Sequence, residues 1–405
     1  MKTDTRQRIF RVPGLVGLVI AALVLAAGLV VPPDAHAWNR HQPTACEQSA
    51  RKMFSACRLE SLEDYNVALA NCANIEDSGE RAECRRDARL ELAEVNEECE
   101  DTYDERLGVC ELLDEDFYED PLSSADVVDP DQISNPNRYF SLKAGDTSVF
   151  RGTEDGEQTD EIIIVRVTDE VRDIEIEEDF FVPCRVVVDA ALIESEDDDE
   201  DGGWDYTLGE LTDDWYAIDS LANVYYCGEL SRNYDEEGVL RDLDGSFEAG
   251  IDAAKAGTLL RPMFPGHGVA DRQEYALGEA EDVVIYLSGG ASPDDEVGGE
   301  NGNDADFECD DMCLQTRDIN PNDPGEYEIK YYVQDVGFVL AAVFEGDAVE
   351  GDGEFTGERE ELVCTGGDEL LDADALEDCG VEDGAELLEE LCEAAPDAFC
   401  DDDDD

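Results

Sequence analysis

The spacing of apolar residues divides the chain into two regions with different periods. Two proline-free stretches, from about Thr44 to Ala73 and from Ser78 to about Leu113, predict long helices. From Tyr139 to about Val363, apolar and polar residues alternate with period two, which is typical of strands. The pattern predicts an α+β protein in which a helical hairpin precedes a large antiparallel β-meander, folded as a curved sheet or a partly open barrel.

Alternation is clear in 181–188, where Val182, Cys184, Val186 and Val188 share one face. Turn-forming dipeptides such as Asp244-Gly245 separate this strand from others of the same kind. The remaining predicted strands are 161–168, 171–177, 204–211, 214–219, 223–230, 271–277, 281–288, 312–319, 325–333 and 336–345.

Six cysteines in the helical region are arranged symmetrically about residue 78, which lies in the turn-like sequence Asp77-Ser78-Gly79. Two facing antiparallel helices can bring such pairs to the Cα separation of about 5.5–6 Å that a disulfide needs. Large apolar residues are few, so disulfides replace much of the core. The spacing predicts the disulfides Cys46–Cys110, Cys57–Cys99 and Cys72–Cys84. The hairpin is either a rigid stalk for a partner or a structural cap.

The N-terminus has the pattern of a secretory signal peptide, predicted over 1–37. Basic residues precede an apolar run from Gly14 to Val31, and Ala35-His36-Ala37 is a small-x-small cleavage site. The alternative is a retained membrane anchor, because the run is nearly long enough to span a bilayer. All fourteen cysteines follow residue 37, which favours disulfides and a secreted protein, extracellular or periplasmic. After cleavage, no integral membrane segment is expected.

Four segments follow from these patterns beyond the signal peptide. Residues 38–113 are the helical hairpin, and 114–138, with three prolines and many acidic residues, is an acidic linker. Residues 139–363 are the antiparallel β-domain. Residues 364–405 are a Cys-containing acidic appendage and tail with a short helical run at 385–393.

Charge excludes some partners. Aspartate and glutamate number 107 against 27 lysine and arginine, a net charge of −80, of which −73 falls in 113–405. A chain without a basic face cannot neutralise phosphates, so nucleic acid is excluded. Regular apolar strands favour a folded protein with an acidic surface over a disordered acidic chain. Acidic excess with only five lysines is typical of proteins adapted to high salt, which screens self-repulsion. Divalent cations are the alternative counter-charge.

A series of short segments carries a resemblance. NRYFSLKAGDT (137–147), DWYAID (214–219) and NVYYCGE (223–229) occur in this order, followed by RQEY (272–275) and KYY (330–332). The series resembles a family of secreted bacterial proteins of unassigned function, over roughly residues 137–345. Members often carry a Cys-rich helical segment ahead of this region. The resemblance implies an envelope or extracellular setting and no catalytic residues.

Two acidic clusters are candidate calcium sites. The first resembles half of an EF-hand loop, although its context is a turn between strands, and the second follows a glycine-rich stretch. The alternative for both is a solvated acidic loop. The predicted metal ligands are Asp197, Asp199, Asp201, Asp304, Asp306 and Glu308. Calcium is the one cofactor that the sequence suggests.

Candidate catalytic groups are less specific. Glu279, Glu281 and Asp282 could act as the acid and base of a glycoside hydrolase, but paired carboxylates are expected by chance in so acidic a chain. His267 lacks a nucleophile motif, and a loop histidine is the simpler interpretation. Five aromatic residues could line a groove or fill the sheet core: Trp204, Trp215, Tyr216, Tyr225 and Tyr226.

The sequence therefore favours a secreted, non-catalytic binding or structural protein of the cell envelope or exterior, adapted to high salt or divalent cations. An extracellular or envelope protein partner is expected, and the ligand is unspecified. One alternative is a carrier that shelters an apolar ligand in the curved sheet, which needs a concave apolar face. The other is a secreted carbohydrate-active hydrolase, which needs two carboxylates in a cleft about 5–10 Å apart.

Overall fold

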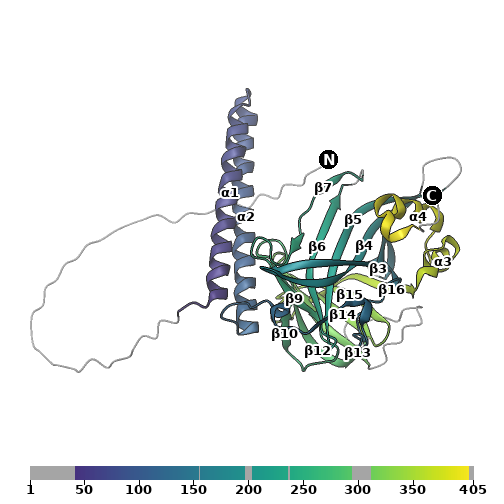
Figure 1. Ribbon diagram of the computed structural model, residues 1–405. Helices are drawn as coiled ribbons and strands as arrows, with labels where there is room; N and C mark the ends of the chain where they lie inside the picture. The colour runs from purple at the N-terminus through teal and green to yellow at the C-terminus, as the bar shows by residue number, and fades with distance from the viewer. Residues whose placement is uncertain (1–41, 155, 197–202, 236–237, 294–311, 401–405) are drawn as a thin grey trace, which may run out of the picture. The chain divides into compact units, whose positions relative to one another are not determined.

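A computed structural model describes residues 42–154, 156–196, 203–235, 238–293 and 312–400 (Figure 1). The chain from Pro43 onward forms one compact unit. The signal peptide predicted over 1–37 lies outside the described residues. Within the described part of the chain, no helix has the length and apolar character needed to cross a membrane.

The N-terminal region is an antiparallel helical hairpin of α1 (Ala45–Ala73) and α2 (Ser78–Leu113). Thr44 and Glu47 form a capping box that starts α1, and Asp77 caps α2 through the amides of the two residues after Ser78. The structure joins Cys46 to Cys110, Cys57 to Cys99 and Cys72 to Cys84, which is the pairing that the mirror spacing predicts.

Disulfides compensate for a thin apolar seam between the two helices. Leu62 of α1 and Leu90 of α2 are 47% and 53% exposed. Phe54 of α1 stacks on Tyr103 of α2 with ring centroids 5.0 Å apart. The covalent links therefore supply much of what packing supplies in a larger helical bundle.

The rest of the described chain is dominated by one antiparallel sheet. Its strands are β1 (Val127–Val128), β2 (Thr147–Glu154), β3 (Glu157–Glu177), β4 (Phe180–Glu196), β5 (Trp204–Asp219), β6 (Val224–Tyr234), β7 (Leu240–Asp242), β8 (Phe247–Glu248), β9 (Lys255–Leu260), β10 (Val269–Arg272), β11 (Glu274–Tyr275), β12 (Val283–Ala291), β13 (Cys313–Ile319), β14 (Glu326–Val333), β15 (Gly337–Glu345) and β16 (Glu354–Gly366).

The sheet closes almost completely on itself. Its strands follow the order β10-β12-β13-β14-β15-β16-β2-β3-β4-β5-β6-β9-β11. The two ends of this order, β10 and β11, are neighbours in the chain, separated only by Gln273. Because β10 pairs with β12 and β11 pairs with β9, the short run 269–275 connects the two edges. The prediction of an α+β fold with a helical hairpin and a curved antiparallel sheet is confirmed.

The observed strands differ from the predicted ones in length and number. The segments 161–168 and 171–177 belong to the single strand β3, and 204–211 and 214–219 both belong to β5. Bulges in the β3–β4 and β4–β5 pairings let long strands bend without ending. Six strands were not predicted: β2, β9 and β16, and the short strands β1, β7 and β8.

The segment 114–138, predicted as a linker, packs along the sheet. It contains the short 3-10 helices η1 (Pro121–Ser123) and η2 (Pro130–Gln132) as well as β1, which pairs with β5. Leu122 is fully buried, and the Tyr118 hydroxyl donates to the carbonyl of Ala256 at 2.8 Å. The connection therefore has a defined path rather than an open one.

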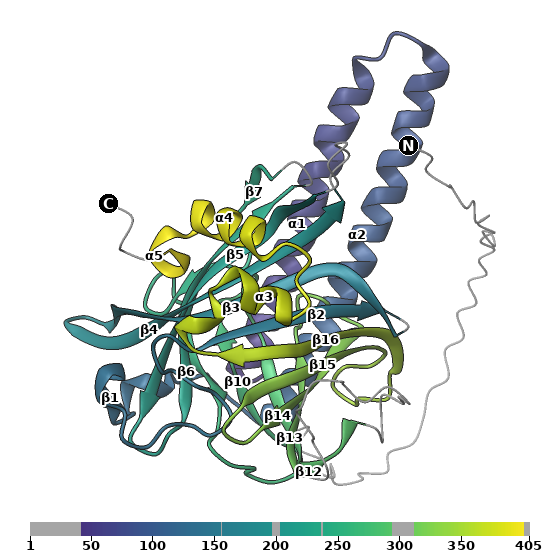
Figure 2. The same cartoon turned by 90° about the vertical axis from the view of Figure 1, so that its right-hand side faces the viewer.

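The C-terminal segment covers one face of the sheet (Figure 2). It contains η4 (Asp368–Leu370), α3 (Ala373–Asp378), α4 (Gly384–Ala394) and α5 (Pro396–Phe399). Leu387 and Leu391 of α4 are fully buried against strands β3 to β6. Disulfides Cys364–Cys379 and Cys392–Cys400 hold this segment.

Candidate ligand-binding site

In each strand of the nearly closed sheet, alternate side chains point to the inside of the sheet and form its inner face. Val165 of β3 lies opposite Asp189 of β4, and Val187 of β4 lies opposite Asp214 of β5. Asp214 in turn lies opposite Glu229 of β6. Directly paired residues of an antiparallel sheet point to the same side, so acidic side chains from neighbouring strands gather on one face.

This inner face surrounds a cavity of about 310 Å³, which we call the inner cavity. Strands from most of the sheet contribute to its wall. Its apolar wall includes Phe140, Phe150, Tyr216, Tyr332 and Phe338, with valines and leucines between them. Its charged side chains are Asp146, Asp189, Asp214, Asp318, Lys330 and Glu360.

Lys330 is the single basic side chain that lines the inner cavity among the described residues, and it is already paired. Its Nζ atom lies 2.9 Å from Glu328 and 3.3 Å from Asp318. Asp318 also accepts hydrogen bonds from Thr316 at 2.8 Å and from Gln273 at 3.3 Å. Lys330 therefore balances its own neighbours and leaves the other carboxyl groups without a matching charge.

Asp189 and Glu360 have neither an ion-pair partner nor a hydrogen-bond donor for their carboxyl groups among the described residues. Neither carboxyl group accepts a hydrogen bond from another described residue, whereas both line the inner cavity. Asp189 lies among the charges of Asp214, Glu210, Glu229 and Glu360. Two carboxyl groups, from β4 and β16, thus face open space inside the sheet.

A tyrosine hydroxyl links two further carboxyl groups. Tyr226 lies within hydrogen-bond distance of Asp214 and 2.9 Å from Glu229. A phenol has one proton to donate, so one of these two contacts needs a proton on the carboxyl group. The geometry therefore requires the Asp214–Tyr226–Glu229 group to hold at least one proton beyond that of the phenol, unless an external cation takes its place.

Burial is the main reason why these groups bind protons tightly. It raises the pKa of Asp214 to about 7 and that of Glu229 to about 8. Burial, followed by the charge of Glu328, raises the pKa of Glu360 to about 8, and burial raises the pKa of Asp189 well above its usual range. Burial would lower the pKa of Lys330, but Glu328 and Asp318 outweigh it, so that pKa lies above its ordinary value.

The opposite face of the same strands is apolar. Val182, Cys184, Val186 and Val188 of β4 belong to a core that includes Leu387 and Leu391 of α4. The disulfide Cys184–Cys227 joins β4 to β6 on this face. One buried ion pair interrupts it, in which Arg151 donates to both carboxylate oxygens of Glu194, at 3.0 and 2.9 Å, and to the carbonyl of Gly380.

Two ion pairs fix the base of the helical hairpin to the sheet. Arg106 of α2 contacts the Glu281 carboxylate, and their side chains are 8% and 3% exposed. Arg272 of β10 contacts Glu115 just beyond α2. Of the predicted catalytic carboxylates, Glu281 is therefore a structural partner of Arg106, and Glu279 is exposed. Burial raises the pKa of Asp282 to about 7, although the nearby charge of Lys330 acts to lower it.

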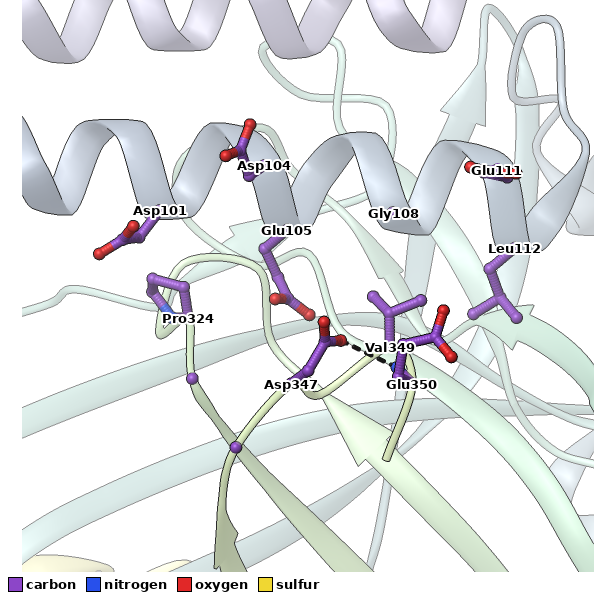
Figure 3. A pocket seen from close by; sticks show the side chains of 12 residues that line it. Asp101, Asp104, Glu105, Gly108, Glu111, Leu112, Pro324, Asp347, Val349 and Glu350 are labelled. Atoms are coloured by element: carbon purple, nitrogen blue, oxygen red, sulfur yellow. Dashed lines mark hydrogen bonds between the residues drawn. The ribbon is translucent and has the colours of Figure 1, made fainter. Parts of the chain in front are cut away.

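A second opening lies beside α2 and is larger but mostly solvated (Figure 3). This acidic cleft has a volume of about 630 Å³ and is lined by Asp101, Asp104, Glu105, Asp347 and Glu350, among others. Figure 3 shows Glu105 directed toward Asp347, whose carboxylate accepts from the Glu350 amide at 2.9 Å. Burial and then the charge of Asp347 raise the pKa of Glu105 to about 7. The other carboxylates are exposed, so water solvates them.

The predicted calcium ligands Asp197, Asp199, Asp201, Asp304, Asp306 and Glu308 lie outside the described residues. Within the described ranges, no group of three or more His, Cys, Asp or Glu side chains is placed to hold a metal ion. His267 contacts the Leu287 carbonyl through Nδ1 at 2.9 Å.

The aromatic residues divide between the two faces. Trp204, Trp215 and Tyr225 pack with the apolar core under the C-terminal helices, whereas Tyr216 and Tyr226 stack on each other at 4.7 Å on the inner face. Their sequence alone did not distinguish a groove from a core.

The sequence reasoning missed Asp189, Asp214, Glu229 and Glu360 as members of a site. One local signal was available: Asp189 interrupts the apolar run 186–193, where an acidic residue is unexpected in a strand buried on both faces. The others could not be found in this way, because acidic residues are common throughout the chain.

Comparisons with known proteins give limited information. No family model matches the chain, and no curated protein matches it. Two solved structures resemble it over 57% of its length. One is a presumed exported protein with a YmcC-like fold from Bacteroides fragilis, with 12% identity, 99% of that chain covered and a TM-score of 0.28. The other is a presumed lipoprotein from Parabacteroides distasonis, with 11% identity, 100% of that chain covered and a TM-score of 0.25. At these TM-scores neither likeness carries an argument about this protein.

Proposed function

We propose that this protein is an exported, non-catalytic binding protein that encloses a small ligand inside its nearly closed sheet. The observation that carries the proposal is the inner cavity, where strands distant in sequence surround about 310 Å³ of space. Pockets for small molecules have volumes of roughly 300–1,000 Å³ and combine apolar walls with a few polar groups. The disulfides indicate an oxidising compartment outside the cytoplasm.

The composition of the wall argues against a purely apolar ligand, which the sequence had offered as an alternative. A hydrocarbon would cover Phe150 and Phe338 well, but it would also remove water from Asp189 and Glu360. Burying an ionised carboxyl group without a hydrogen-bond partner costs on the order of several kcal/mol, unless the group takes up a proton. A ligand with at least one polar group fits this wall better.

A glycoside hydrolase is supported less well. The catalytic carboxylates of such enzymes face each other across an open gap that admits the glycosidic bond. Asp214 and Glu229 are instead connected through the Tyr226 hydroxyl, so the phenol occupies the space between them. This arrangement suits a fixed proton network better than an acid and a base on opposite sides of a substrate.

The test is whether the inner cavity takes up small molecules. Thermal unfolding would be followed with 2-phenylethylamine, 2-phenylethanol, 3-phenylpropionate, dodecanoate and a disaccharide as probes. At least one probe should raise the melting temperature of the wild type, because a ligand that binds only the folded state stabilises it.

Ser148→Trp places a large side chain at the wall of the inner cavity and should abolish the shift. Gln158→Trp adds the same group at an exposed position of β3 and should leave the shift unchanged. A chain that none of the five probes stabilises, or equal stabilisation of the Ser148→Trp variant, would contradict the proposal.

A further inference from the structure

The carboxyl groups of the inner cavity carry information about the ligand itself. Asp189, Asp214 and Glu360 line the cavity from β4, β5 and β16. Asp189 and Asp214 lie on adjacent strands, one diagonal step apart in the register, since Val187 is directly opposite Asp214. Such diagonal neighbours are roughly 7–8 Å apart between their Cα atoms. We call these three carboxyl groups the acidic side of the cavity: Asp189 and Asp214 are neighbours, and the charge of Glu360 reaches Asp189.

Nothing in the described protein neutralises this acidic side. Lys330, the one basic side chain of the wall, is held by Glu328 and Asp318. Asp189 and Glu360, both only partly exposed, line the inner cavity, and their carboxyl groups accept no hydrogen bond from a described residue. A group in this position needs either its own proton or a cation from outside.

Aromatic side chains lie among these groups on the wall. Phe150 and Phe338 are 5.2 Å apart between ring centroids, and Phe338 is 5.7 Å from Tyr332. Tyr216 and Phe140 lie 5.0 Å apart, edge to face. Aromatic faces attract ammonium groups and pack against apolar bodies, and both effects strengthen where water is excluded. The cavity therefore offers carboxyl groups for a positive charge and rings for an organic body.

Resting on the proposed function, we propose that the ligand is a small organic cation, an amine whose ammonium group lies among Asp189, Asp214 and Glu360 and whose body packs against the rings of Phe150, Tyr332 and Phe338. A bare divalent ion suits this arrangement less, because Ca²⁺ takes about six to eight oxygen ligands at about 2.3–2.6 Å. The carboxyl groups here come from separate parts of the wall, with aromatic side chains among them.

Binding exchanges a proton for the ligand. In the empty cavity, the Asp214–Tyr226–Glu229 group holds at least one proton beyond that of the phenol, as the shared hydroxyl requires. When an ammonium group enters, a carboxyl group releases its proton to solvent and becomes the carboxylate that pairs with the cation. The charged groups around this exchange are Glu210, Asp213 and Glu229 beside Asp214, and Glu161, Glu328 and Lys330 beside Glu360. Net charge is conserved, because one proton leaves for each ammonium that enters.

Three probes with one ring and different head groups test the charge: 2-phenylethylamine, 2-phenylethanol and 3-phenylpropionate. Titration calorimetry of the whole protein at pH 7, in two buffers of different ionisation enthalpy, measures both affinity and proton release. The amine should bind at least about tenfold more tightly than the alcohol, a difference of about 1.4 kcal/mol, and should release a proton. Binding should tighten as the pH rises from 6 to 8.

Asp189→Asn and Glu360→Gln keep the shape of the wall and remove its charge. Each should weaken amine binding about tenfold or more and leave alcohol binding within about twofold. Glu178→Gln changes the net charge equally at an exposed turn and should leave both affinities unchanged. Circular dichroism of the variants would establish that they are folded.

The outcomes separate the two proposals. Equal or tighter binding of the alcohol or the propionate would overturn the organic cation and leave the binding function standing. Calcium chloride that competes with the amine, with the competition lost in Asp189→Asn, would replace the organic cation with a metal ion. Failure of all three probes in the wild type would overturn the organic cation, and failure of dodecanoate and the disaccharide as well would overturn the binding function.

Discussion

The two faces of strands β3 to β6 differ in chemistry although they share one backbone. On the outer face, Val186 and Val188 of β4 pack under the C-terminal helices. On the inner face, the intervening Val187 and Asp189 line a cavity with Asp214 of the next strand. The outer face is filled by another element of the chain, whereas the inner face leaves space and unbalanced carboxyl groups. Alternation along a strand therefore identifies two faces but does not say which one another element covers and which one lines a cavity.

The largest expected loss of stability comes from breaking the buried ion pair between Arg151 and Glu194 on the outer face. Arg151→Met removes the guanidinium from Glu194, leaving a buried carboxylate without its partner. The free energy of unfolding should fall by about 3–5 kcal/mol, as measured by urea denaturation. Arg138→Met breaks an exposed ion pair with Asp335 and should cost no more than about 1 kcal/mol. Equal losses in the two variants would show that the outer face is as well hydrated as the surface.

Truncation under the C-terminal helices tests the packing of the same face. Leu391→Ala removes a fully buried side chain and should cost about 2–5 kcal/mol in urea denaturation. Leu221→Ala, at a residue that is 71% exposed, is the matched control and should change stability by less than about 0.5 kcal/mol. A negligible loss at Leu391 would mean that the α4 cover contributes little to the stability of the sheet.

The inner face should respond to pH in the opposite sense to ordinary paired carboxylates. Asp214 and Glu229 have folded pKa values of about 7 and about 8, above the unfolded values of about 3.9 and 4.3. Between about pH 4 and pH 8 the folded state therefore binds more protons than the unfolded state, so stability falls as pH rises through this window. We expect a loss of about 1–3 kcal/mol between pH 5 and pH 9, measured by urea denaturation.

The double variant Asp214→Asn with Glu229→Gln removes both groups and should flatten this dependence. Asp372→Asn with Glu377→Gln makes the same chemical change in the C-terminal segment and should retain it. A wild-type protein that is equally stable, or more stable, at pH 9 would contradict the protonated inner cavity.

The smallest effect separates surface charge from cavity charge. Raising sodium chloride from about 10 mM to 1 M shortens the Debye length from about 30 Å to about 3 Å. Repulsion across the acidic region 113–405 should weaken, which raises the melting temperature by a few degrees. The fall in stability from pH 5 to pH 9 should persist in 1 M salt, because screening acts weakly on enclosed groups. If the fall in stability with pH disappeared in 1 M salt, those carboxyl groups would be in contact with bulk solvent.

The two halves of the fold differ in how far sequence could predict them. The hairpin was predictable to its disulfides, because the cysteine spacing reports a local geometry in which two regular helices run side by side. The class of the β-domain followed from alternation, but closure did not. It depends on the short pairings of β10 with β12 and of β11 with β9, whose few residues carry no distinct pattern.

The site was less predictable than the fold. The face with Val182, Cys184, Val186 and Val188 was correctly recognised as one side of a strand. Its cover comes from α4, about 200 residues later in the chain, and no local pattern announces that contact. Whether the face of β14 that carries Lys330 meets solvent or a cavity depends on the curvature of the sheet. Burial, and with it the proton affinity of each carboxyl group, is a property of the closed sheet.

The order in which the chain is made gives the C-terminal segment a further consequence. Strand β2 pairs with β16, and the apolar face of β4 receives α4, so early strands depend on the last residues to be translated. A chain whose C-terminal residues have not yet been made lacks these partners and cannot complete its sheet. The domain can therefore close only after nearly all of it has been synthesised. Cys364–Cys379 and Cys392–Cys400 then hold the C-terminal segment in place.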